Sequence, residues 1–240
     1  MEEFKTLAGH PVCPLGLAGN PDMGSACVDV AYQAGVNYFF FYSLQFQGLI
    51  VGLNRLVKGN RESVVLATGT ESRDPAEMRG YFDQAGRRLG VEDIDIFFAE
   101  YISPSDDMAQ VFGALEEIWA WKETGKVRYV GATCHNRELA LKLIESGRVE
   151  VLMHRYNMAH RGAEEKVLPA AESADIPVVS FTNTRWGSLL KGHSDWQGDP
   201  PQAADCYRYV LRQQAVKLAL TAPGTVRELK ENLDVVIHSS

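Results

Sequence analysis

The strongest constraint on the fold is a repeated alternation along the chain between short apolar segments and longer amphipathic ones. Most of the apolar segments are continuous runs, which is typical of strands that are covered on both faces in a parallel sheet. Eight such segments predict eight strands, over Val12–Leu17, Val36–Phe41, Ser63–Thr68, Ile94–Ala99, Val127–Ala132, Val149–Met153, Ile176–Phe181 and Ala215–Leu220.

Segments with helical periodicity lie between the predicted strands. Val111, Leu115 and Ile118 fall on one face of a helix, because residues three and four apart share a helix face. Either Asp106 or Asp107 can cap the start of this helix. The same spacing of apolar residues predicts helices in the other intervals, so the chain has the order strand, helix, strand, helix throughout.

Eight strand–helix units in 240 residues predict a (β/α)8 barrel, an architecture that typically takes ~250 residues. An open doubly wound sheet is the alternative, and it calls for a G-x-G-x-x-G turn after an early strand. The segment Leu15–Asn20 does not supply that turn. We therefore expect one barrel domain over residues 1–240, with the functional residues on the loops that follow the strands.

Composition narrows the classes of partner. The net charge is -7 at pH 7 and the sequence has no prominent cluster of Lys and Arg, which disfavours nucleic acid and anionic membranes. Apolar runs fall short of the ~20 residues of a membrane helix, and the acidic start lacks the basic segment of a secretory signal. The four cysteines are widely spread, without a C-x-x-C pair. We expect a cytoplasmic protein that acts on a small molecule and binds neither nucleic acid nor a membrane.

Short motifs occur in a fixed order along nearly the whole chain. The most specific are Gly113–Leu115 and, after it, Gly125–Gly131. Others are Ala34–Phe39, Leu89–Asp95, Arg155–Asn157, Trp186–Gly192 and Glu231–Asn232. Together they resemble the aldo-keto reductase superfamily. The resemblance implies a (β/α)8 barrel, here in a short form with a reduced C-terminal loop, and reduction of a carbonyl with hydride from NADPH.

The resemblance also implies four catalytic positions, an Asp, a Tyr, a Lys and a His, and this chain departs from the family at all of them. The corresponding residues are Phe40, Gln45, Gly69 and Glu100. A phenol needs a nearby cation to donate its proton readily at neutral pH, and Gly69 cannot supply one. We therefore expect a divergent member that lacks the tetrad. One branch of the family, which acts on steroid double bonds, also carries Glu at the His position.

The positions that the resemblance assigns to the cofactor depart from the family as well. Ala222 and Pro223 stand where basic and hydroxyl residues are expected, and Glu228 stands where Arg or Gln is expected. A carboxylate is unfavourable beside a 2′-phosphate, which favours Arg or Lys. Glu231 and Asn232 match the family's adenine contacts and are interpreted as vestigial. We expect no cofactor, with weak NADP binding as the alternative.

Polar residues gather at the predicted strand ends. Glu100 is the leading candidate for a general acid or base, because the aromatic neighbours Phe98 and Tyr101 could raise its pKa. Arg155 could hold a substrate carboxylate through two hydrogen bonds, whereas an ion pair between Glu100 and Arg155 is the structural alternative. The remaining candidates are Tyr101 and His135 as catalytic residues, and Tyr42, Glu71, Cys134, His154, Arg185 and Trp186 as substrate-binding residues.

Two further arrangements of these residues stay open, although we expect no metal. One is an O2N2 metal site made of Glu71, Glu100, His135 and His154. His154 falls between two inward positions, which argues against it. The other is a nucleophile made of Cys134 beside His135, but adjacent strand residues point to opposite faces, which favours a plain buried thiol. The segment His160–Glu164 is expected to begin the sixth helix.

A polar barrel mouth without the reductase tetrad favours replacement of the family's chemistry. We therefore expect an enzyme that performs proton-transfer chemistry on a small polar metabolite, as an acid/base lyase, an isomerase or a hydrolase. Two alternatives stay open. One is an NAD(P)H-dependent oxidoreductase with a relocated proton donor such as Tyr42 or Tyr101, and the other is a non-catalytic pseudoenzyme or binding protein.

Overall fold

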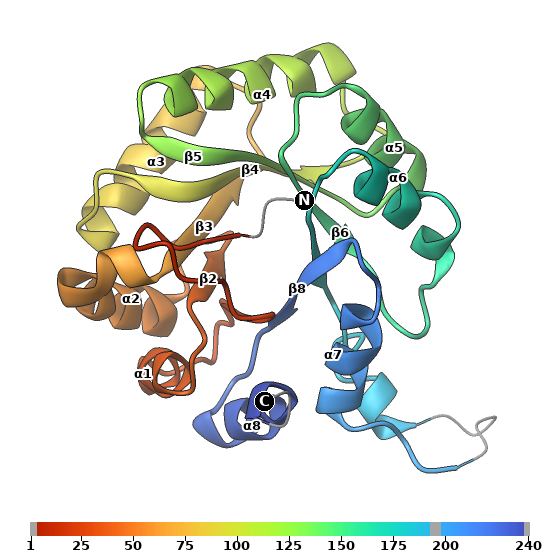
Figure 1. Ribbon diagram of the computed structural model, residues 1–240. Coiled ribbons are helices and arrows are strands. Elements are labelled where there is room, and N and C mark those ends of the chain that lie inside the picture. The colour runs from red at the N-terminus through yellow and green to blue at the C-terminus, as the bar shows by residue number, and fades with distance from the viewer. Residues whose placement is uncertain (1–3, 193–197, 238–240) are drawn as a thin grey trace.

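The strands of the chain close into a barrel. In the computed structural model, which describes residues 4–192 and 198–237, eight parallel strands follow one another in chain order. β1 and β8 pair with each other and complete the ring. Figure 1 shows the helices as an outer layer around the strands, with the colour running from red near β1 to blue at β8. The predicted (β/α)8 barrel is confirmed.

All eight predicted strands are present, with shifted ends. They are β1 (Leu15–Ala18), β2 (Tyr38–Phe41), β3 (Val65–Thr70), β4 (Ile94–Ile102), β5 (Val127–Cys134), β6 (Val151–Arg155), β7 (Val178–Phe181) and β8 (Val216–Thr221). β3 to β6 each run two or three residues past their predicted ends, because backbone pairing continues after the apolar run stops. Ile102 still pairs with Cys134, and Arg155 still pairs with Phe181.

The helices are α1 (Ala26–Gln33), α2 (Gln47–Asn60), α3 (Pro75–Leu89), α4 (Met108–Glu123), α5 (Arg137–Glu145), α6 (Val167–Ser173), α7 (Ala203–Leu211), α8 (Val226–Asn232) and α9 (Asp234–Ile237). Of the two candidate caps for α4, Asp107 is the one whose side chain accepts from a backbone amide of the first turn. None of the described helices has the length and apolar character that crossing a membrane requires.

The start of the sixth helix differs from expectation. Residues 162–164 form a short 3-10 turn, and α6 begins at Val167. The expectation that His160–Glu164 starts this helix is therefore wrong. The physical reason lies at Lys166, whose φ of -140° is far from helical values and separates the turn from the helix.

Alternate residues of each strand face the inside and the outside of the barrel. Tyr38 and Phe40 of β2 belong to the interior cluster, whereas Phe39 and Phe41 pack outward under the helices. Phe4 also belongs to the interior cluster and packs edge-on against Tyr129 of β5, with 5.9 Å between the ring centroids. The amino ends of the strands are thus covered, and the interior of the barrel opens at the carboxyl ends of the strands.

Two interior glycines make room for β4. A Cβ at Gly69 would lie 2.2 Å from the carbonyl oxygen of Phe98 and 2.8 Å from Cγ of Glu100. A Cβ at Gly131 would lie 2.3 Å from the Phe98 ring. Such distances are too short for any side chain, so β3 must carry glycine at position 69 unless the backbone of β4 moves, and a side chain at position 131 would displace the Phe98 ring. The absence of a side chain at Gly69 is what allows Glu100 to lie beside it.

Candidate active site

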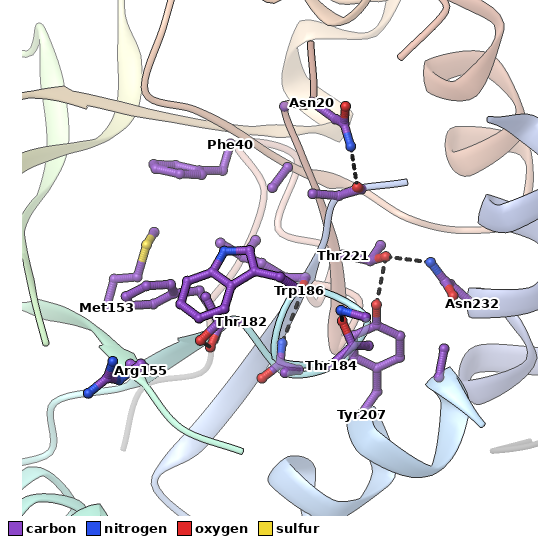
Figure 2. A pocket seen from close by; sticks show the side chains of 18 of the residues that line it. Asn20, Phe40, Met153, Arg155, Thr182, Thr184, Trp186, Tyr207, Thr221 and Asn232 are labelled. Atoms are coloured by element: carbon purple, nitrogen blue, oxygen red, sulfur yellow. Dashed lines mark hydrogen bonds between the residues drawn. The ribbon is translucent and has the colours of Figure 1, made fainter. Parts of the chain in front are cut away.

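A cavity of about 1430 Å³ opens at the carboxyl ends of the strands. Residues from each of the eight strands, or from the loops after them, contribute to its lining. Many of the candidates named from the sequence are brought together here: Tyr42, Glu71, Glu100, Tyr101, His135, Arg155, Trp186, Glu231 and Asn232. Figure 2 shows part of this lining, with the Trp186 ring across its middle.

Three predicted substrate-binding residues lie outside this cavity, so the expectation that they border it is wrong. Cys134 and His154 take outward positions because β5 and β6 extend further than expected, and strand alternation still applies there. Both are buried, and Nδ1 of His154 donates to the carbonyl of Cys134 over 2.9 Å. Burial raises the pKa of Cys134 to about 12, which rules out a thiolate nucleophile. Arg185 is exposed on the loop after β7.

Glu100 is the ionisable group most affected by the fold. It follows Ile96 and Phe98 on the inward face of β4 and is 7% exposed. Its Oε2 accepts a hydrogen bond from Thr133 over 2.8 Å, and its Oε1 has no partner among the described residues. Burial raises the pKa of Glu100 to about 8, opposed by the Thr133 hydrogen bond. The side chain is therefore mainly a neutral carboxylic acid at pH 7.

Two residues that were not among the predicted site residues hold Glu100 in place. Thr133 on β5 donates to the carboxyl and also accepts from the backbone amide of Tyr101 over 2.6 Å. Arg73, after β3, donates to the backbone carbonyl of Glu100 over 2.7 Å and pairs with Asp106 over 3.1 Å. The inward alternation of β5 was the available signal for Thr133. The Glu100–Arg155 ion pair considered from the sequence does not form, because Oε1 has no partner.

Aromatic side chains form the wall next to Glu100. Tyr101 packs edge-on against His135 at 5.2 Å between ring centroids, and His135 packs against Phe181 at 4.8 Å. Burial, followed by the positive charge of Arg155, lowers the pKa of His135. Tyr101 adopts a left-handed backbone with φ of 52°, and its side chain is exposed. The wall therefore consists of three aromatic rings, of which Tyr101 and His135 also carry polar atoms.

The opposite side of the cavity lies at β8 and α8. Oγ1 of Thr221 accepts hydrogen bonds from Tyr207 and from Asn232, each over 2.8 Å, and Figure 2 shows the three side chains together. Glu228 lines the cavity and accepts from the amide of Gly224 over 2.8 Å. This end of the cavity is therefore a fixed set of hydroxyl, amide and carboxylate groups.

The proposed metal ligands are not brought together. Glu71, Glu100 and His135 line the large cavity, but His154 does not. In the part of the chain that the structure describes, no three His, Cys, Asp or Glu side chains are grouped so that they could hold a metal ion. The O2N2 alternative is therefore wrong, because β6 directs His154 outward.

Comparison with known proteins finds reductases among the relatives of this chain. The sequence model of the Aldo/keto reductase family matches residues 20–203. L-Glyceraldehyde 3-phosphate reductase of Escherichia coli K12 is 26% identical over 113 residues, which is 45% of this chain and 32% of the relative. NADH-specific methylglyoxal reductase of the same strain is 24% identical over 204 residues, or 72% and 61%. The matches thus span about a third to three fifths of the length of these relatives.

A solved structure agrees over the whole fold. The holo form of aldo-keto reductase AKR11C1 from Bacillus halodurans superposes with a TM-score of 0.81 and 19% sequence identity. The superposition covers 100% of this chain and 92% of that one. At this identity the likeness establishes the fold.

The comparisons correct the expected chemistry. The expectation of no cofactor is contradicted, because carbonyl reduction needs a source of hydride and one relative is named for its NADH specificity. A lyase, isomerase or hydrolase finds no support among the relatives, and the oxidoreductase alternative is better supported. The family match covers far more than half of the sequence, and the closed eight-stranded barrel agrees with it. This chain belongs to the aldo/keto reductase family.

Proposed function

We propose that the chain is an NADH-linked oxidoreductase that reduces the carbonyl group of a small molecule, with Glu100 as the proton donor. The observation that carries the proposal is the Glu100 carboxyl group, which lines the cavity with one oxygen held by Thr133 and the other unpartnered. Oε1 is buried in this structure, so the carboxyl can donate a hydrogen bond to a substrate oxygen once its side chain turns that oxygen toward the cavity.

The lining of the cavity fits a dinucleotide. Apolar and aromatic surfaces from Met153 and Phe181 lie at one end, and the Thr221–Asn232 group lies at the other. Figure 2 gives the order of these groups, with Trp186 between Met153 and Asn232. A bound nicotinamide would supply the hydride at the apolar end. The polar end would hold the ribose and adenine through hydroxyl and amide groups.

The charge at the polar end favours NADH over NADPH. Glu228 and Glu231 both line the cavity. Carboxylates accept hydrogen bonds from ribose hydroxyls and repel a 2′-phosphate. Arg227 is 91% exposed, pairs with Glu231 over 3.3 Å, and does not line the cavity. Neutralisation of a 2′-phosphate by Arg227 would therefore require its side chain to turn inward.

The chain's own residues account for the proton that a carbonyl oxygen gains on reduction. Neutral Glu100 donates its proton to the oxygen as hydride reaches the carbon, and the resulting carboxylate recovers a proton from water. At pH 7 the neutral form outnumbers the ionised form by roughly ten to one, since burial raises the pKa of Glu100 to about 8. Thr133 fixes the orientation of the carboxyl group through Oε2.

Glu100 is preferred over the two tyrosines as proton donor. Tyr42 is 57% exposed and packs edge-on against Phe46, and Tyr101 is 55% exposed. Neither hydroxyl has a hydrogen-bond partner among the described residues that would fix its direction. The residues lining the cavity include no lysine in the described part of the chain, so a tyrosine there lacks an ammonium group to assist proton donation.

Two measurements test the proposal. Fluorescence titration with NADH and NADPH should give saturable binding of NADH, weaker binding of NADPH, and a gain in NADPH affinity for Glu228→Gln. With a panel of small carbonyl compounds, including methylglyoxal and L-glyceraldehyde 3-phosphate, Glu100→Gln should lower kcat by about 10²-fold or more. The control Glu145→Gln changes an exposed carboxylate on α5 and should leave kcat unchanged. Absence of NADH binding, or full activity of Glu100→Gln, would overturn the proposal.

A further inference from the structure

A second cavity of about 390 Å³ lies beside the first. It is bordered by the start of α5, the end of β6 and the loop before α6. His135 and Arg155 line both cavities. The chemistry of the second cavity can therefore act on a molecule that is bound in the first.

The second cavity is rich in positive charge. Among the described residues, its lining includes three arginines and three histidines and no carboxylate: Arg137, Arg155, Arg161, His135, His154 and His160. Arg161 is paired with Glu164 over 3.0 Å. The guanidinium groups of Arg137 and Arg155 have no ion pair or hydrogen bond with any residue in the ranges 4–192 and 198–237. Two guanidinium groups thus face this cavity without a counter-charge.

The pKa values of the three histidines are consistent with this excess of positive charge. Burial is the main cause that lowers the pKa of His135, of His160, and of His154, the last to about 4, and the charge of Arg155 contributes at all three. Nearby carboxylates are absent from these causes, whereas Arg137 and Arg185 add to them. The imidazoles are therefore neutral at pH 7, and an anion in the cavity would raise their pKa values.

The amides of the α5 N-terminus are not the source of this charge. The Asn136 side chain accepts from the amides of Glu138 and Leu139 over 2.9 and 3.0 Å. The cavity therefore depends on its side chains, of which Arg155 is the central one because it is only partly exposed and lines both cavities. A guanidinium group with free N–H donors matches the geometry of a phosphate or carboxylate.

We propose that the second cavity binds the oxyanion group of the substrate, a phosphate or a carboxylate, through Arg155 and Arg137. The substrate class is then a small aldehyde or ketone whose anionic end lies in the second cavity and whose carbonyl lies by Glu100. The substrate assignment rests on the proposed function, whereas oxyanion binding does not. In Figure 2 Arg155 lies across Trp186 from Asn232, which separates this anion site from the polar end assigned to the cofactor.

The test uses the full chain without cofactor, titrated with inorganic phosphate and separately with acetate at constant ionic strength. Calorimetry should give saturable binding of at least one anion with a Kd of about 1 mM. Arg155→Ala should weaken it about tenfold or more, and Arg155→Lys should restore part of the loss. Arg79→Ala is the matched control, since Arg79 is an exposed arginine on α3 paired with Glu117, and it should leave the Kd unchanged. Preference for phosphate or for acetate identifies the anionic group of the substrate.

Histidine NMR gives an independent readout. The bound anion should raise the pKa values of His135 and His160 in the wild type but not in Arg155→Ala. No saturable binding of either anion, or binding that survives Arg155→Ala and is displaced by NADH, would overturn the inference. NADH titration separates the two proposals. Protein that binds phosphate at Arg155 but does not bind NADH supports this inference and overturns the proposed cofactor. Protein that binds NADH but neither anion supports the proposed cofactor and overturns this inference.

Discussion

Replacement of Glu100 by glutamine should change how the stability of the protein depends on pH. Burial raises the pKa of Glu100 from 4.5 to about 8. Below pH 4.5 the folded and unfolded states both hold this proton, so the group favours neither. Between pH 4.5 and about 8 the unfolded chain releases the proton and the folded chain keeps it. Stability therefore falls as pH rises through this range.

The size of the effect follows from the same values. Each pH unit between 4.5 and about 8 costs the folded state ~1.4 kcal/mol. The whole range corresponds to a loss on the order of 5 kcal/mol, which is a large part of the stability of an ordinary domain. The amide of Glu100→Gln has no proton to lose, so the variant should overtake the wild type in stability as pH rises. Above pH 8 the difference should become constant.

Urea unfolding between about pH 5 and pH 9 measures this difference. Wild type, Glu100→Gln and the exposed-carboxylate control Glu145→Gln are compared, with the denaturant slope checked for equality between variants. The control should follow the wild type, and only Glu100→Gln should have a flatter dependence on pH. Parallel curves for wild type and Glu100→Gln would refute the assignment of a neutral, buried carboxyl, and with it the proposed proton donor.

Three further changes test the surroundings of the site. Gly69→Ala should lower the free energy of unfolding by about 1–3 kcal/mol or more, because the added Cβ would clash with the backbone of Phe98. Gly113→Ala, at an exposed position of α4, should be neutral or stabilising by up to ~1 kcal/mol in the same urea assay. Thr133→Val removes a hydrogen bond that lowers the Glu100 pKa, so the pH range of falling stability should extend above pH 8; an unchanged range would contradict the role of Thr133. Burial is the main cause that lowers the pKa of His154 to about 4. As pH falls below 6.5 the unfolded chain therefore gains a proton that the folded chain does not, and the free energy of unfolding falls by ~1.4 kcal/mol per pH unit down to about pH 4. His154→Gln should abolish this loss in urea unfolding measured on the acid side.

The fold could be predicted because each strand contains a local signal, a short apolar run, in its own sequence. Runs such as Val64–Ala67 are continuously apolar, which is typical of a strand that is covered on both faces in a parallel sheet. The ends were less predictable, because pairing between β4 and β5 continues through polar residues to Ile102 and Cys134. Hydrogen bonding between neighbours decides where a strand stops, and the sequence of one strand does not contain its neighbour's register.

The site was predicted in part. Glu100 was expected at the barrel mouth because it follows the end of a predicted strand, and it lines the cavity. Cys134 and His154 were expected at the mouth for the same reason, but β5 and β6 continue through them, and strand alternation directs both side chains outward. The contact between Thr133 and Glu100 joins positions 33 residues apart, and a single sequence has no signal for such a pair. The expectation of no cofactor failed because differences at aligned positions were given more weight than the family match as a whole.

The energetics of position 100 themselves argue for function. A buried carboxyl with one unpartnered oxygen lowers stability at neutral pH, and the fold accommodates it with glycine at position 69 and a hydroxyl at position 133. An apolar side chain on β4, as at Ile96 and Phe98, would cost less. A Glu100→Gln variant that is both more stable and less active would therefore separate the two requirements. That result would mean that the Glu100 carboxyl is kept for the reaction although it lowers the stability of the fold, which is expected at functional sites.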